Sequence, residues 1–187
     1  MYRHRPRHRI ARILWRPSIG TILLLLTWAA ILGLPAGAAQ ANVYAFRWAG
    51  SVVCVEMHAS THYPVKAAVH AWDSAPDLHL TYQRDCTDYR QVVRVYSGWY
   101  GKHDWAAQTV LRWAGGRFVS PLTIRLNNSY AWGYSWGSRA HLASHELGHA
   151  LGEDHTTHYR SVMRPGAYQY AYPQPYDYGE IERLYPW

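Results

Sequence analysis

The chain has 187 residues, 49% of them hydrophobic and 15% aromatic, which is enough for one ordinary domain with a buried core. Its formal charge of +7 is uneven, because six arginines lie within the first 16 residues and all twelve acids lie beyond residue 41. The rest of the chain carries thirteen Lys and Arg, a formal charge of about +1, so charge argues against a nucleic-acid-binding protein.

Residues 1–41 have the pattern of a secretory signal peptide. An arginine-rich start is followed by an apolar run at 19–34 and then by small residues that offer cleavage after Ala38 or Ala41. The alternative is an uncleaved membrane anchor, but 16 apolar residues are fewer than the roughly 20 that span a bilayer. We therefore expect a secreted, extracellular protein with a single domain over 42–187 and no stable membrane association after cleavage.

Two cysteines, Cys54 and Cys86, lie in the predicted mature part. In an exported protein such a pair is expected to form a disulfide. Metal binding by the two thiols is the weaker interpretation, because neither belongs to a C-x-x-C pattern. The sequence therefore predicts one disulfide and no free thiol.

The first half of the predicted domain indicates strands and one helix. Residues 43–46 and 51–56 are rich in β-branched and aromatic side chains, which favour extended segments. Residues 64–74 begin with a proline and carry apolar residues at a helical period. Residues 78–82 and 92–96 alternate as strands do. The order strand, helix, strand, strand favours a βαβ unit with parallel pairing.

The second half predicts two more strands and two helices. Residues 107–113 and 122–126 have strand composition, with a pair of glycines between them that predicts a turn. A helix is predicted over 138–151 and a shorter one over 177–185. Each predicted helix begins at a residue that can cap it, a serine and an aspartate respectively.

Candidate catalytic residues lie in the stretch 145–155, which has the pattern H-E-x-x-H-x-x-G-x-x-H. On a helix, His145 and His149 project from the same face and can reach one ion. Gly152 allows the helix to end and the chain to reverse, so that His155 becomes a third ligand. Three neutral nitrogen ligands and one open position are typical of a catalytic zinc, for which Glu146 is the candidate general base.

Two alternatives concern the histidines of this region. The helix could be histidine-rich and simply pack in the core, but the extension of H-E-x-x-H to a third histidine is far rarer than the short motif. His158 could replace His155 as the third ligand, although the position of Gly152 favours His155. His141 lies on the same helix face, one turn too early to reach the ion, so we expect it to support the site or to pack.

The segment Ser-Val-Met-Arg-Pro at 161–165 fits the turn that underlies the metal in metzincins. With the histidine motif, it makes the chain resemble the metzincin zinc metalloproteases, and among them the matrixin-like branch. Thr156 lies where matrixins usually have a serine, and Met163 begins their Met-x-Pro pattern. The resemblance covers 42–187 in layout and is specific in its motifs from residue 138 onward.

The resemblance implies an α+β fold. It implies a twisted, mostly parallel five-stranded sheet with one antiparallel edge strand, two long helices at about 64–74 and 138–151, and a short C-terminal helix. It also implies that the segment around 107–113 is this edge strand, above a cleft where Ala107 and Val110 would meet an extended substrate peptide. An ordinary hairpin is the alternative for that segment.

Further implications of the resemblance concern the surroundings of the metal. Met163 would provide a hydrophobic floor, and the region after it, with Pro165 and Tyr168, would wall the specificity pocket. Matrixins carry structural zinc and calcium in the stretch that corresponds to 97–105, but here only His103 and Asp104 resemble ligands. The sequence therefore favours one catalytic zinc and argues against structural calcium or a second zinc.

We therefore predict a secreted, monomeric zinc endopeptidase with a polypeptide substrate and no nucleic-acid partner. The alternative is a secreted zinc-containing binding module, associated with a cell wall or matrix, whose exposed Trp and Tyr side chains stack on sugars. Glu146 distinguishes the two, because a binding or structural zinc protein does not need a carboxylate directly after the first ligand.

Overall fold

The computed structural model describes residues 43–166 and 169–186, so the predicted signal peptide lies outside the described part. The described residues belong to one unit by their contacts. Its elements are β1 (Val52–His58), α2 (Val65–Trp72), β2 (His79–Gln83), β3 (Val92–Gly98), β4 (Ala107–Val110), β5 (Trp113–Ala114), β6 (Arg117–Phe118), β7 (Leu122–Asn127), α3 (Asn128–Ala131), α4 (Trp136–Leu151) and α5 (Pro175–Leu184).

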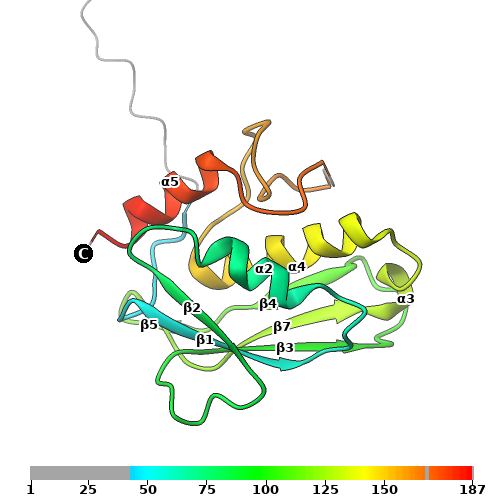
Figure 1. Cartoon of the computed structure of the whole chain (residues 1–187), viewed down its shortest axis with the longest axis horizontal. Coiled ribbons are helices and arrows are strands. Elements are labelled where there is room, and N and C mark those ends of the chain that lie inside the picture. Colours follow the sequence, from blue (N-terminus) through cyan, green and yellow to red (C-terminus); the bar gives the residue numbers. More distant parts are fainter. Residues whose placement is uncertain (1–42, 167–168, 187) are drawn as a thin grey trace, which may run out of the picture. The chain divides into compact units, whose positions relative to one another are not determined.

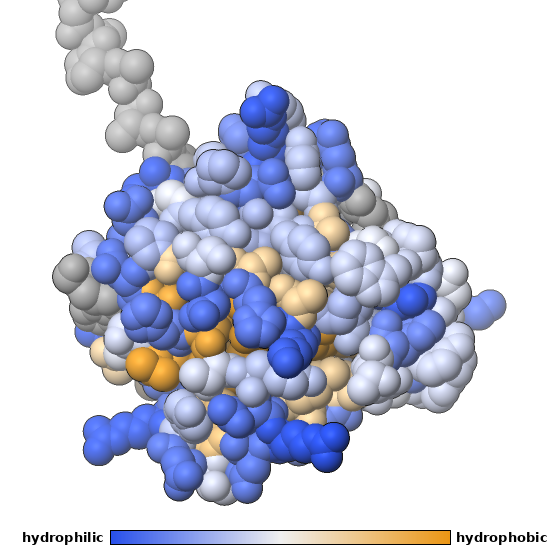
Figure 2. Space-filling model, viewed as in Figure 1, coloured by the Kyte–Doolittle hydropathy of each residue, from blue (hydrophilic) through white to orange (hydrophobic). Residues whose placement is uncertain are grey.

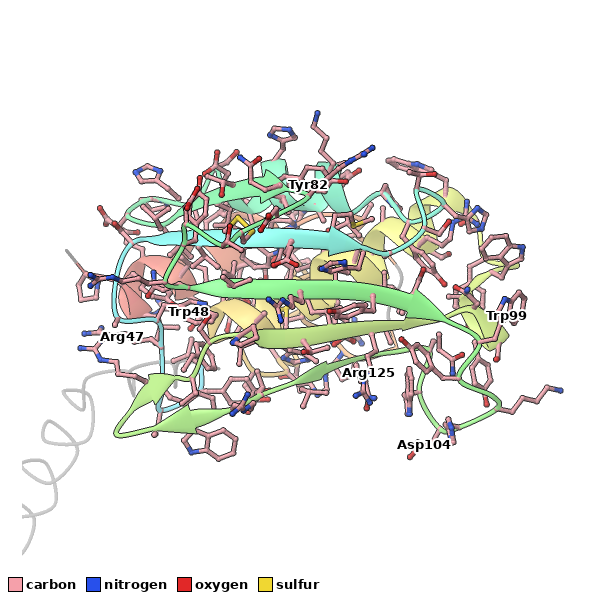
Figure 3. The ribbon with its side chains drawn as sticks, turned by 90° about the horizontal axis from the view of Figure 1, so that it is seen from below. Arg47, Trp48, Tyr82, Trp99, Asp104 and Arg125 are labelled. Atoms are coloured by element: carbon pink, nitrogen blue, oxygen red, sulfur yellow. A yellow bond between two sulfur atoms is a disulfide. The ribbon has the colours of Figure 1, made fainter. Side chains whose placement is uncertain are left out.

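A five-stranded sheet with the order β2-β1-β3-β7-β4 organises the unit. Strand β1 pairs in parallel with β2 and β3, β3 pairs in parallel with β7, and β4 pairs antiparallel with β7 at the edge. Helices α2 and α4 lie together over one face of this sheet (Figure 1), and Figure 3 shows the opposite face in front of the helices. The structure confirms the predicted α+β fold with a mostly parallel sheet and an antiparallel edge strand.

The two faces of the sheet differ in chemistry because side chains alternate along each strand. Apolar residues such as Val53, Val95 and Ile124 belong to the main core, together with Trp72 of α2 and Leu147 of α4. Polar side chains on neighbouring strands β1 and β3 pair with one another. On this other face, an Arg94 nitrogen lies 3.3 Å from a Glu56 carboxylate oxygen, and the His58 ring stacks on the Tyr96 ring.

The predicted disulfide is present between Cys54 of β1 and Cys86 of the β2–β3 connection, with Cα atoms 6.0 Å apart. Both cysteines are buried, in a small cluster with Val92 that is separate from the main core. No free cysteine occurs in the described part of the chain, as the sequence predicts.

Two predicted helix starts are wrong. Helix α4 begins at Trp136 rather than at Ser138, because the Ser135 hydroxyl accepts the Ser138 backbone N–H at 3.1 Å and caps the helix. Helix α5 begins at Pro175, and Asp177 is not its N-cap. Asp177 instead lies inside the first turn and accepts the Gln174 backbone N–H at 2.7 Å.

Other elements also differ from the sequence prediction. Helix α2 has only 8 residues. The strand predicted over 107–113 ends at Val110, which pairs with Thr123, one residue from the beginning of its partner β7 at Leu122. Trp113 pairs with Phe118 in the β5–β6 hairpin instead. Residues 43–47 form isolated bridges rather than the predicted strand. The short helix α3 was not predicted.

No helix within the described residues is long and apolar enough to cross a membrane. Figure 2, in the view of Figure 1, shows hydrophilic residues over most of the visible face and a band of apolar residues across α2 and β2.

Candidate metal centre

The three predicted ligands come together at the end of α4. His145 and His149 are buried on successive turns of α4, and His155 follows on an exposed loop. The Nε2 atom of His155 lies 3.1 Å from Nε2 of His145 and 3.2 Å from Nε2 of His149. This group of three imidazoles could hold a metal ion.

The hydrogen bonds of the ring nitrogens show that this group fits a metal. His145 Nδ1 lies 2.8 Å from the Val162 carbonyl oxygen, and His149 Nδ1 lies 2.8 Å from the Glu153 carbonyl oxygen. Because a carbonyl only accepts, each Nδ1 carries the proton and each Nε2 presents its lone pair. Tetrahedral zinc with nitrogen ligands at its usual distance separates those nitrogens by about 3.3 Å, close to the spacing found here.

Burial keeps the two helical ligands neutral. Desolvation, together with the neighbouring charge of His149, lowers the pKa of His145 to about 3. Desolvation also lowers the pKa of His149 to about 4, against a smaller opposing effect of its hydrogen bond to Glu153. Both rings are therefore uncharged at pH 7, which is the form in which imidazole binds a metal.

Gly152 makes the reversal that returns His155 to the site. It ends α4 in the left-handed region, with φ at 112°. The Glu153 N–H donates to the Gly148 carbonyl at 3.0 Å, which closes the turn. A Cβ atom at Gly152 would also lie 2.3 Å from a methyl carbon of Leu184, so both backbone angle and space require glycine here.

Met163 is fully buried beneath α4, as the resemblance implies. Its sulfur packs so closely against Gly148 that a Cβ atom there would lie 2.4 Å away. The turn that carries Met163 is held by Asp177, which accepts the Val162 N–H at 3.0 Å and the Ser161 hydroxyl. The Val162 carbonyl accepts the hydrogen bond of His145 Nδ1. Asp177 of helix α5 therefore helps to orient His145 through this turn.

Glu146 is buried beside the ligands and is oriented by the edge strand. The Thr109 hydroxyl of β4 lies 2.7 Å from a Glu146 carboxylate oxygen and 2.8 Å from the Glu146 carbonyl oxygen. Desolvation raises the pKa of Glu146 to about 7, and the hydrogen bond from Thr109 opposes that rise. A carboxyl with a pKa near neutrality can both accept and return a proton at physiological pH.

A cavity of about 440 Å³ opens over this centre. Its lining comprises Tyr44, Asp104, Trp105, Ala106, Ala107, Gln108, Thr109, Leu111, His141, Leu142, His145, Glu146, His149, His155, Pro165 and Gly166. Of the four predicted cleft residues, Ala107 and Pro165 line it. Val110 is partly exposed on β4 but outside the lining, and Tyr168 lies outside the described residues.

The remaining histidines of the region do not join the three ligands. His141 is buried one turn before His145, with Nδ1 at 2.7 Å from the Tyr170 carbonyl oxygen, and lines the cavity. His158 stacks on Tyr176 with ring centroids 4.0 Å apart. Among the described residues, His145, His149 and His155 make the one cluster of this kind, and His103 stacks on Trp105.

Tyr44 and Thr109, which contact His149 and Glu146, were not predicted from the sequence. Both reach the site from distant parts of the chain, since Thr109 is 37 residues from Glu146 and Tyr44 is 105 residues from His149. Neither belongs to a motif, so no local pattern in the sequence marks them. No protein-family model matches the chain, and no curated protein matches it either.

Proposed function

We propose that the chain is a secreted zinc endopeptidase of the matrixin-like type. The observation that carries the proposal is the presence of Glu146 beside the converging imidazoles in one open cavity. A structural metal site does not need a buried carboxylate whose pKa is about 7, whereas hydrolysis requires such a base. The disulfide supports the secreted location, because such bridges persist in oxidising compartments.

His145, His149 and His155 would hold the zinc ion, which when bound would supply a water with a pKa of about 7 and would polarise the scissile carbonyl group. Glu146 accepts the proton of the attacking water while the water oxygen forms its bond to the scissile carbonyl carbon. Glu146 then delivers this proton to the amine nitrogen as the carbon–nitrogen bond breaks. Thr109 keeps the carboxylate of Glu146 directed into the cavity between these two transfers.

The edge strand supports a polypeptide as the substrate. Strand β4 is the last strand of the sheet and pairs with β7 on one side. Its residues Ala107, Gln108 and Thr109 line the cavity that contains Glu146. An extended peptide can add to the free side of β4 through backbone hydrogen bonds, which brings one of its carbonyl groups towards Glu146.

The proposal is tested by removing and restoring the metal. We expect a strong zinc chelator to abolish casein cleavage by protein purified from expression of the full chain, and added zinc to restore it. His155→Ala and His158→Ala form a matched pair, because both histidines lie on the same loop and only His155 joins the ligand cluster. Zinc binding and cleavage should be lost in His155→Ala and kept in His158→Ala. Equal zinc content in both variants contradicts the proposed centre.

A further inference from the structure

The segment 43–48 lies against the end of α4, next to the metal ligands. The Tyr44 backbone N–H donates to the Gly152 carbonyl at 2.8 Å, and Val43 forms an antiparallel bridge with Glu153. The Trp48 indole N–H donates to the Ala150 carbonyl at 2.9 Å. Figure 3 shows Arg47 and Trp48 at the end of the sheet remote from Trp99 and Asp104. This segment is therefore hydrogen-bonded to the backbone around the link between His149 and His155.

Stacked rings fix the side chain of Tyr44. Its ring lies parallel to that of Phe46, with centroids 5.1 Å apart, and Phe46 stacks in turn on Trp113 at 4.6 Å. The Tyr44 ring also lies 6.0 Å from the His149 ring. Such a column of rings limits the rotation of Tyr44 and directs its hydroxyl towards the metal cavity, which Tyr44 lines.

The Tyr44 hydroxyl lies between the second histidine of the cluster and Asp154, the residue before the third. Its oxygen lies 3.2 Å from His149 Nδ1, whose proton it can accept alongside the nearer Glu153 carbonyl. Burial and the nearby Asp154 carboxylate raise the pKa of Tyr44 to about 12, so the hydroxyl keeps its hydrogen and can donate it to Asp154. Asp154 in turn accepts the backbone N–H of His155 at 2.7 Å. The Tyr44 hydroxyl therefore contacts the second histidine directly and lies near the carboxylate that accepts from the backbone of the third.

We propose that Tyr44 is a positioning residue of the metal centre and sets the place of His155 through Asp154. The inference rests on the proposed function in so far as these histidines bind zinc. His145 and His149 are buried on a helix with Nδ1 held by carbonyl groups, whereas His155 is exposed on a loop. The third ligand is therefore the one that most needs a support from outside its own segment.

Zinc affinity, measured by chelator competition without any substrate, tests this role. Tyr44→Phe removes the hydroxyl and keeps the stacked ring. Because residues that orient ligands contribute roughly 10–100-fold in metal affinity, we expect the Kd for zinc to rise at least about tenfold. We also expect a changed visible absorption spectrum of the cobalt-substituted protein, since the geometry of the ligands changes. Tyr178→Phe is the matched control, because the Tyr178 hydroxyl donates to Ala71 between α5 and α2 and should not affect zinc.

A double-substitution cycle identifies Asp154 as the intermediary. Asp154→Ala should weaken zinc binding by itself, and adding Tyr44→Phe to it should cause little further loss. The inference is overturned if Tyr44→Phe leaves the zinc Kd and the cobalt spectrum unchanged. It is also overturned if the two single losses multiply in the double variant.

The outcomes separate this inference from the proposed function. A parent protein that binds zinc tightly but cleaves no polypeptide contradicts the endopeptidase, while the effect of Tyr44→Phe on the Kd still supports the positioning role. A parent protein that binds no zinc overturns both.

Discussion

Glu146 is oriented by a single hydroxyl from another element, Thr109 of β4. Because this hydrogen bond stabilises the ionised carboxylate, Thr109→Val should raise the pKa of Glu146 by about one unit. A base acts in its ionised form, so a higher pKa reduces activity on the acid side of the profile. We expect kcat/KM to fall about tenfold at pH 6 and much less at pH 9.

Thr81→Val is the control for this substitution. The Thr81 hydroxyl is buried on β2 without a hydrogen-bond partner, so its removal should leave the pH profile of kcat/KM unchanged. If Thr109→Val and the parent protein show the same profile, Thr109 does not tune the base.

At the residue scale, the sequence predicts the ligands and the base but not their supports. His145, Glu146, His149 and His155 follow from a short local motif, because helical geometry fixes the spacing of the first three and the turn at Gly152 returns His155. Thr109 and Tyr44 come from separate segments and meet the motif only through tertiary packing. A single sequence contains no periodicity that links such distant positions, so these contacts could be found only in the folded structure.

Among the elements, α4 depends on close contact with the turn beneath it. A methyl group added at Gly148 would meet the Met163 sulfur at 2.4 Å and the Trp72 ring at 2.9 Å. We expect Gly148→Ala to lower the free energy of unfolding by about 1–3 kcal/mol through overpacking. It should also weaken zinc binding, because the displaced turn carries the Val162 carbonyl that orients His145. Urea unfolding and zinc titration measure the two effects.

Gly179→Ala in α5 is the matched control for Gly148→Ala. Nothing lies within 4 Å of a Cβ atom at Gly179, so the higher helix propensity of alanine should stabilise the protein by up to about 1 kcal/mol. If Gly148→Ala is as stable as Gly179→Ala, the close packing of α4 on Met163 is not a constraint on the fold.

The type of an element could be predicted where its sequence pattern is local. Boundaries that depend on distant residues could not be predicted. The periodic apolar residues predict α2 and α4, but two serines could cap α4 and only the structure shows that Ser135 does so. Strand composition continues past Val110, yet the strand ends there, one residue before its pairing would reach the beginning of β7. Pairing partners decide where a strand ends, and a single sequence does not contain them.

In the molecule as a whole, the disulfide and the candidate metal centre belong to different packing regions. The Cys54–Cys86 bridge closes a 32-residue separation, for which the chain-entropy model gives about 3.7 kcal/mol. The double substitution Cys54→Ala and Cys86→Ala should lower the free energy of unfolding by about this amount. Zinc affinity should remain, because the bridge belongs to a cluster apart from the core that includes α4. Unchanged stability in urea would show that the bridge does not form.

In the proposed hydrolysis, the buried carboxylate of Glu146 acts together with a zinc ion held by three histidines. The most direct measurement compares the parent protein with Glu146→Gln for zinc per chain and for cleavage of an unstructured polypeptide. We predict one zinc in both proteins, because Glu146 is not among the ligands, and cleavage by the parent alone. Cleavage by Glu146→Gln at the parent rate, or the absence of zinc from both proteins, would contradict the account.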